Sequence, residues 1–255
     1  MNLQLCRIVL RPRSPLECFD LGFRLAREWW PPLWRLGLLI LGPAWVLCVG
    51  VAWLADWHPA AALVPIALGP VLQAPFTLLV GRLLFSSEAR LADVGRDLLG
   101  RFGTWFGGLT LTALAATLGS ALCGLSVPLL LGMLYVPECT LLEQVTPDRA
   151  LRRSWRLVGG NVASAVVGAF GRWLLMAWCA AVTEAGGLAL LGYVLQARVD
   201  VPDALEGLAG PGLLAGILLS HPLWAIWRLM LYVDVRTRVE GWDLQVGLRA
   251  AGLAR

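Results

Sequence analysis

The sequence contains no lysine, and all 21 of its basic residues are arginine. This absence excludes chemistry that needs a lysine amine, such as a phosphate-binding P-loop, a Schiff base or a pyridoxal phosphate anchor. Charged residues of both signs are also scarce: they make up 15% of the 255 residues, whereas globular domains carry about 25%. Apolar residues account for 58% of the chain. The composition therefore indicates an integral membrane protein.

Histidine and cysteine offer little for catalysis or metal binding. The two histidines, His58 and His221, are far apart, so no HExxH motif or paired-histidine ligand set is present. The six cysteines have no C-x-x-C spacing, and we interpret them as small buried apolar residues. We expect His221 to be a packed or hydrogen-bonded helix residue. The sequence thus predicts no enzyme activity, no cofactor and no metal site.

Long apolar runs predict six transmembrane helices, since about 20 apolar residues cross a bilayer. Two runs precede residue 86, an uncharged stretch broken at 123–128 forms a hairpin of two more, and two follow residue 161. The predicted spans are 33–55, 60–85, two within 103–143, 162–194 and 212–233. We therefore predict an all-α integral membrane protein that forms a single membrane domain, 1–255.

The distribution of arginine predicts the orientation of these spans. Nineteen of the 21 arginines fall on one side, Arg198 falls on the other, and Arg172 lies within the fifth span. Basic residues are enriched at the cytoplasmic ends of membrane helices. Both termini are therefore predicted to be cytoplasmic.

Three similar segments suggest a repeat of a short amphipathic helix followed by a two-span hairpin. The copies start at Ser14, Ser86 and Thr146, and each hydroxyl is suited to cap a helix N-terminus. Ser14 has Glu17 three residues later, which is the capping-box pattern. The predicted repeat units are 14–85, 86–145 and 146–233, followed by a cytoplasmic tail, 234–255.

The amphipathic segments place arginines where anionic lipid binds. Such helices lie in the membrane plane, with arginines against lipid phosphates. The mixed charges at 234–240 share a face if the segment is extended and spread around a continuing helix. They suit docking against Arg152, Arg153 and Arg156 or a protein partner, or belong to a solvated tail. The arginines expected to face lipid or a partner are Arg24, Arg27, Arg149, Arg152, Arg153, Arg156, Arg236 and Arg238.

Ionisable and proline residues within the spans are the remaining signals. A charge inside a bilayer is costly and usually has a partner, so Glu138 and Arg172, both toward the cytoplasmic half, are predicted to form an ion pair. This pair is either a structural clamp or part of a substrate or proton path. The second span carries Pro65, Pro70 and Pro75, which predicts either a kinked helix or a broken helix of the kind that forms transporter sites.

Three stretches resemble a known membrane-domain family. They are 13–25, 150–157 and 231–244, which read RSPLECFDLGFRL, ALRRSWRL and LYVDVRTRVEGWDL. They look like the membrane domain attached to some glycerophosphoryl diester phosphodiesterases, a family with many free-standing bacterial members. The resemblance implies a multi-span helical bundle of the bacterial inner membrane. It does not imply phosphodiesterase activity, because the hydrolase is a separate barrel domain.

These observations lead to two functional hypotheses. The first is a non-enzymatic inner-membrane scaffold or accessory subunit that binds anionic lipid and a protein partner on its cytoplasmic face. The alternative is a small-molecule or lipid transporter that uses the second span and the Glu138–Arg172 pair. A transporter needs a solvent-connected polar cavity near the middle of the membrane, whereas a scaffold can be solidly packed there. No nucleic-acid-binding motif is present.

Overall fold

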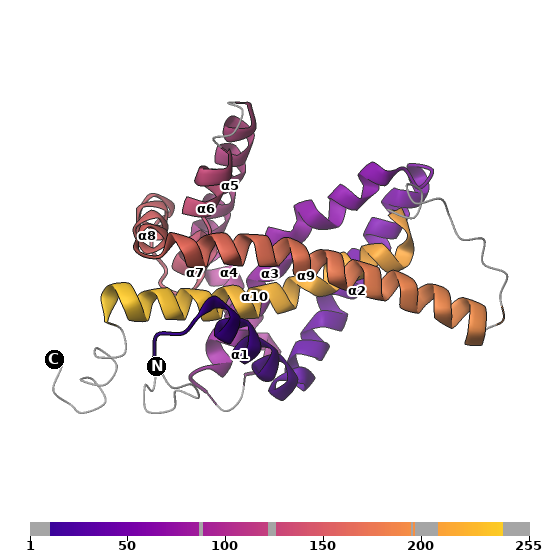
Figure 1. Ribbon diagram of the computed structural model, residues 1–255, viewed down its shortest axis with the longest axis horizontal. Helices are drawn as coiled ribbons and strands as arrows, with labels where there is room; N and C mark the ends of the chain where they lie inside the picture. The colour runs from indigo at the N-terminus through magenta and orange to yellow at the C-terminus, as the bar shows by residue number, and fades with distance from the viewer. Residues whose placement is uncertain (1–10, 87–88, 122–125, 195, 197–208, 242–255) are drawn as a thin grey trace. The chain divides into compact units, whose positions relative to one another are not determined.

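The computed structural model describes residues 11–86, 89–121, 126–194, 196 and 209–241. All regular secondary structure in these residues is helical, which confirms the all-α class (Figure 1). The elements are α1 (Pro15–Glu28), α2 (Trp30–Leu54), the short 3₁₀ helix η2 (Pro59–Ala62), α3 (Leu63–Leu83), α4 (Leu91–Gly100), α5 (Phe102–Ala121), α6 (Ser126–Gly132), α7 (Val136–Leu141), α8 (Pro147–Gly160), α9 (Val162–Ala189), the π-helical turn η3 (Leu190–Val194) and α10 (Pro211–Glu240).

Four helical segments within the described residues are long and apolar enough to cross a membrane: Trp30–Leu54, Pro59–Leu83, Val162–Tyr193 and Pro211–Glu240. They coincide with the first, second, fifth and sixth predicted spans. The third and fourth predicted spans are not among them. Four glycines and four threonines dilute the apolar character of α5, and α6 and α7 have only 7 and 6 residues. Six spans are therefore not confirmed.

The chain divides into two compact units. The first contains Met1–Pro32, Ala74–Phe170 and Ala225–Arg255, and the second contains Leu33–Gln73 and Gly171–Trp224. These boundaries do not follow the predicted repeat units 14–85, 86–145 and 146–233. The repeat therefore stays a prediction.

In the first unit, α1 begins at the capping box that the sequence predicts. The Ser14 hydroxyl accepts the Glu17 N–H at 3.2 Å, and the Glu17 carboxylate accepts the Ser14 N–H at 3.4 Å. The buried face of α1 packs on α10, where Phe19 meets the Trp227 ring with centroids 4.5 Å apart. A Cβ at Gly22 would lie 3.6 Å from the Trp227 Cα, so the two backbones approach closely. A second apolar strip, including Leu16, stays exposed.

The other two predicted caps differ from expectation. Helix α8 starts at Pro147 as predicted, but the Thr146 hydroxyl donates to Asp148 Oδ1 at 2.6 Å and makes no capping bond. Ser86 does not start a helix: its hydroxyl donates to the Arg82 carbonyl at 2.8 Å, near the end of α3. Hydroxyl residues bond equally well to nearby side chains and carbonyls, so the residue type alone does not fix a cap.

Helices α5, α6 and α7 form a hairpin whose two ends are held together. Arg101, directly before α5, donates to the Leu141 carbonyl at the end of α7. Arg101 also lies 3.6 Å from Asp97, which binds Arg82 at 2.8 Å. The two ends of the hairpin thus share one polar clamp with α4 and the end of α3.

In the second unit, α9 and α10 pack through small residues. A Cβ at Gly216 would overlap the Cys179 carbonyl of α9, so only glycine permits this approach. Glu184 of α9 accepts the Leu213 N–H at 2.6 Å and so caps the start of α10. Gly212, one turn earlier on α10, also approaches α9 closely, since a Cβ there would lie 3.0 Å from the Glu184 Cα.

Candidate functional site

The C-terminal half of α10 presents polar residues on two of its sides within the first unit. One row recurs every four residues and so shares a side of the helix: Arg228, Tyr232, Arg236 and Glu240. The second row consists of Asp234 and Arg238, again four apart. Of the two arrangements that the sequence left open for 234–240, the continuing helix is the one observed.

The first member of this row along the chain, Arg228, binds Glu138 of α7. Arg228 Nε donates to Glu138 Oε1 at 2.6 Å, and the side chains are only 7% and 0% exposed. Glu138 Oε2 and the Tyr135 hydroxyl are buried with no hydrogen-bond partner among the described residues. Removing one member of such a pair leaves an uncompensated buried charge. The Arg228–Glu138 pair is therefore shielded from water, and the loss of either side chain should destabilise the protein.

This pair corrects the predicted Glu138–Arg172 ion pair. Glu138 has Arg228 as its partner, while Arg172 belongs to the second unit, where its guanidinium lies 5.8 Å from the centroid of the Trp173 ring. The expectation that the buried Glu138 carboxylate has a cationic partner is confirmed, although the partner is a different arginine. The sequence could not name that partner, because Arg228 counts equally well as a flanking cytoplasmic arginine.

A five-residue cluster lies further along the same row. Arg153 of α8 binds Glu143 and Glu240, each at 2.9 Å, and Arg236 binds the same two carboxylates at 3.3 and 2.9 Å. The Tyr232 hydroxyl donates to Glu143. Burial alone would lower the pKa of Arg153, but the hydrogen bond and charge of Glu143 outweigh it and raise that pKa. The cluster therefore stays charged and ties α8 to α10.

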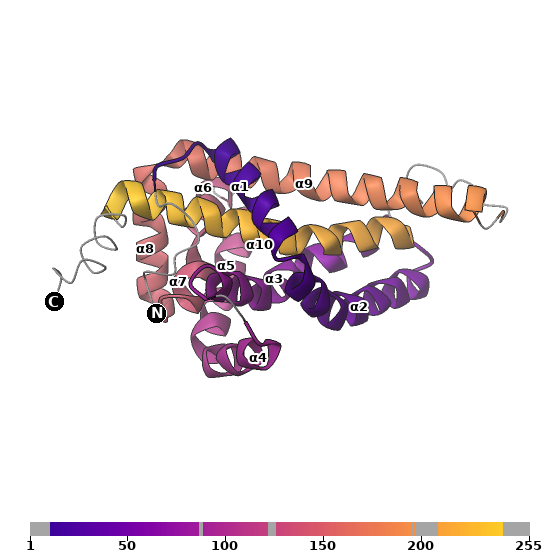
Figure 2. The same cartoon turned by 90° about the horizontal axis from the view of Figure 1, so that it is seen from below.

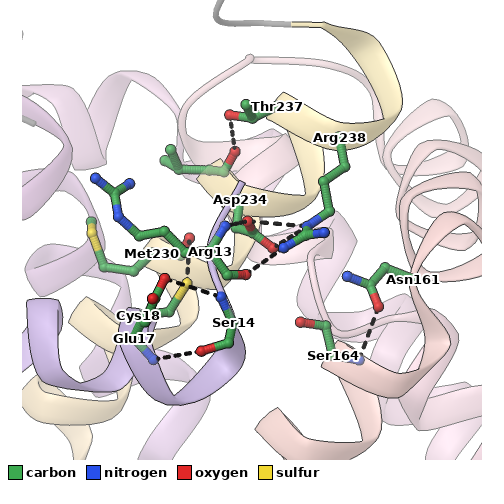
Figure 3. A network of polar contacts seen from close by, with 11 residues as sticks. Arg13, Ser14, Glu17, Cys18, Asn161, Ser164, Met230, Asp234, Thr237 and Arg238 are labelled. Atoms are coloured by element: carbon green, nitrogen blue, oxygen red, sulfur yellow. Dashed lines mark hydrogen bonds and ion pairs between the residues drawn. The ribbon is translucent and has the colours of Figure 1, made fainter. Parts of the chain in front are cut away.

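The second row of α10 forms hydrogen bonds to the backbone just before α1 (Figure 3). Asp234 accepts the Arg13 N–H at 2.6 Å, and Arg238 donates to the Arg13 carbonyl at 2.6 Å while binding Asp234 at 3.0 Å. Both backbone groups of residue 13 are thus held by one Asp–Arg pair. Nearby, Cys18 donates to the Met230 carbonyl at 3.9 Å, and burial, followed by the charge of Asp234, raises the pKa of Cys18 to about 12.

The arginines predicted to face lipid or a partner fall into two groups. Arg153, Arg236 and Arg238 form the internal ion pairs described above, and the predicted docking of 234–240 against α8 is confirmed at Arg153 and Glu240. The remaining five have exposed side chains: Arg24, Arg27, Arg149, Arg152 and Arg156. Their binding to lipid or a partner stays a prediction.

Sequence reasoning missed Arg228 and Tyr232 as members of this site. The four-residue spacing of 228, 232, 236 and 240 was the available signal, because it places polar groups in one line on a helix. The three stretches that carry the family resemblance do meet here. Arg13 comes from the first, Arg153 from the second, and the residues from Tyr232 to Glu240 from the third.

Among the described residues of the second unit, the buried polar side chains are those of Gln73, Ser220 and His221, and none is a carboxylate or a guanidinium. His221 Nε2 lies 3.0 Å from the Pro65 carbonyl, and its Nδ1 lies 3.3 Å from Gln73 Nε2. A neutral ring with the proton on Nε2 satisfies both contacts, since Nε2 then donates and Nδ1 accepts. His221 is hydrogen-bonded, as the sequence predicts. Helix α3 runs uninterrupted from Leu63 to Leu83 despite its three prolines, so the broken-helix alternative is wrong.

Neither unit offers a metal-binding cluster in the part of the chain that the structure describes, because no three His, Cys, Asp or Glu side chains there are grouped to hold an ion. Four membrane-length helices and an internally paired charge cluster define a helical protein suited to a membrane. Comparisons of the chain with family models, curated proteins and solved structures find no match. The family resemblance therefore stays a prediction.

Proposed function

We propose that the chain is a non-enzymatic scaffold or accessory subunit of the bacterial inner membrane, with both termini in the cytoplasm. In this proposal its cytoplasmic face binds anionic lipid and a protein partner. The observation that carries the proposal is the division of arginines on α8. Arg153 points into a neutral internal cluster, whereas Arg149, Arg152 and Arg156 point outward along one side of the same helix.

The outward arginines of α8 carry little counter-charge. Asp148 binds Arg152 at 2.9 Å, and hydrogen bonds from Thr146 and Arg152 hold the pKa of Asp148 below its usual value, so this acid stays charged. Arg149 and Arg156 have no ion pair among the described residues. An amphipathic helix with uncompensated guanidinium groups is attracted to anionic phosphates, by about 1 kcal/mol per basic residue at a membrane surface. This supports the lipid half of the proposal.

The arrangement of helices also supports cytoplasmic termini. Four spans are an even number, and a hairpin whose two ends are clamped together returns to its own side. The 19 arginines therefore remain on one side whether four or six helices cross the membrane. This agrees with the positive-inside rule.

Two features that would support the transporter alternative, a broken second span and a Glu138–Arg172 pair, are not observed in the described residues. Helix α3 is continuous across its three prolines, so it offers no broken helix with exposed carbonyls. Glu138 is held by Arg228 in a closed, buried pair. Both features favour a packed structural protein.

The test compares two double variants in nanodiscs formed directly from native membranes. Arg149→Gln/Arg156→Gln removes the two unpaired arginines of α8. The control Arg90→Gln/Arg96→Gln removes the same charge from two exposed sites: the N-cap of α4 and, within α4, an arginine that pairs with Asp93 at 3.6 Å. We expect the α8 variant to lose the enrichment of anionic phospholipid several-fold, measured by mass spectrometry, and to lose co-purifying protein. The α4 variant should keep both. Equal lipid and protein content in all three samples would contradict the proposal.

A further inference from the structure

The α5–α6 hairpin has a direction that apolarity alone does not predict. In the first unit, α5 and α6 run across the C-terminal half of α10 instead of alongside it, and the two views agree (Figures 1 and 2). Helix α10 is a candidate membrane span, and α5 is not. If α10 crosses the bilayer, α5 and α6 are therefore oriented along the membrane plane.

The surface of this hairpin is apolar and exposed. No charged residue occurs between 102 and 137. The side chains that α5 and α6 expose include large apolar groups at 48 to 62% exposure: Phe102, Phe106, Leu114, Val127 and Leu130. Contact with water is unfavourable for such a surface, at about 25 cal/mol per Å² of apolar area. The surface needs an apolar covering.

Neighbouring elements of the same unit indicate what that covering is. Helix α8 is amphipathic, and a Cβ at Gly132 at the end of α6 would overlap the Trp155 ring of α8. The hairpin is thus in contact with a helix whose arginines suit the headgroup level. Helix α9 follows α8 directly, and its first turns expose Val162, Val166 and Phe170, which suit acyl chains. Helix α8 thus contacts the hairpin and leads directly into an exposed apolar stretch of α9.

We infer that α5 and α6 form an arm that lies within the cytoplasmic leaflet and binds its acyl chains without crossing the membrane. The hydrogen bond from Arg101, directly before α5, to the Leu141 carbonyl at the end of α7 ties together the two ends of the segment that contains the arm. The arm adds protein cross-section to one leaflet only. The inference rests on the proposed orientation of the spans, and the experiment below separates the two.

The test measures the membrane depth of nitroxide labels along two helices. Labels go singly at exposed positions 102, 106, 110 and 114 of α5 and, as the internal control, at 166, 170, 174 and 178 of α9. The native cysteines are replaced, and the protein is held in nanodiscs of phosphatidylglycerol and phosphatidylcholine. A helix along the membrane normal changes depth by about 6 Å every four residues. Relative collision rates with oxygen and a water-soluble nickel complex report that depth.

We expect the α9 labels to show this gradient and the α5 labels to stay at one depth, accessible to oxygen and protected from nickel. A gradient on both helices would overturn the in-plane arm and leave the proposed spans standing. Nickel access along α5 would overturn the acyl-chain contact. A flat profile on α9 would instead contradict the proposed membrane orientation. Genetically encoded labels at the same positions provide a second measurement if cysteine replacement unfolds the protein.

Discussion

The contacts inside the first unit differ in chemistry from the contacts inside the second, although α10 contributes residues to both units. In the first unit, residues 225–240 of α10 form charged pairs with Glu138, Glu143 and Arg153 and hydrogen-bond to the backbone of Arg13. In the second unit, residues 211–224 rely on glycine contacts, on a carboxylate that caps the helix, and on a neutral histidine. The two halves of α10 therefore pack against their neighbours through different kinds of contact.

The contrast follows from the environment that each half of α10 is suited to. Within hydrocarbon, backbone groups must be satisfied internally, and helices associate through small residues and neutral hydrogen bonds. Charged networks are tolerated where the ions are mutually paired and water is near. The two halves therefore differ in what a substitution should cost.

Glu138→Ala should have the largest effect. It leaves Arg228 buried without its partner, so the free energy of unfolding should fall by about 3 to 5 kcal/mol. SDS unfolding of the purified protein followed by circular dichroism measures this. The double variant Glu138→Leu/Arg228→Leu should recover most of the loss, because it removes both charges. A double variant as unstable as the single would show that the charge pairing is not what matters.

Gly216→Ala should have the next largest effect, in the second unit. The added Cβ overlaps the Cys179 carbonyl, which is backbone and cannot rotate away, so α9 and α10 must separate. Overpacking of this kind costs about 1 to 3 kcal/mol. The matched control is Gly42→Ala in α2, where a Cβ meets nothing within 4 Å. Equal unfolding midpoints for the two variants would refute close packing at residue 216.

Gln73→Leu should have a smaller effect, because it removes one neutral hydrogen bond to His221. Such bonds between membrane helices contribute about 0.6 kcal/mol on average. A double-mutant cycle with His221→Leu measures the coupling energy. A coupling as large as that of the Glu138–Arg228 pair would remove the proposed difference between the units.

Asp20→Asn should have the smallest effect. Asp20 and Arg24 form an exposed i,i+4 pair on α1 at 2.8 Å, and such pairs contribute about 0.3 to 0.5 kcal/mol, less at high salt. The unfolding midpoint should change little, and the change should vanish in high salt. A loss comparable to that of Glu138→Ala would mean that burial does not set the importance of these pairs.

The sequence predicted the features that depend on local signals. The capping box at Ser14 and the start of α8 at Pro147 depend on neighbouring residues, and four of the spans depend on long apolar runs. It did not predict the partner of Glu138, because arginines 228 and 172 carry the same charge and only tertiary packing chooses between them. It also did not predict the direction of α5 relative to α10 (Figure 1), because a run of apolar residues does not specify how its helix is oriented against another helix.

The orientation inferred from arginine is the central claim, and labelling with a membrane-impermeant maleimide tests it most directly. Single cysteines replace Arg152 on α8 and Asp56 in the turn after α2, in a background without other cysteines. In intact spheroplasts, Asp56→Cys should react, and Arg152→Cys should react only after the membrane is permeabilised. Reaction of Arg152→Cys from outside intact cells, with Asp56→Cys protected, would contradict the account.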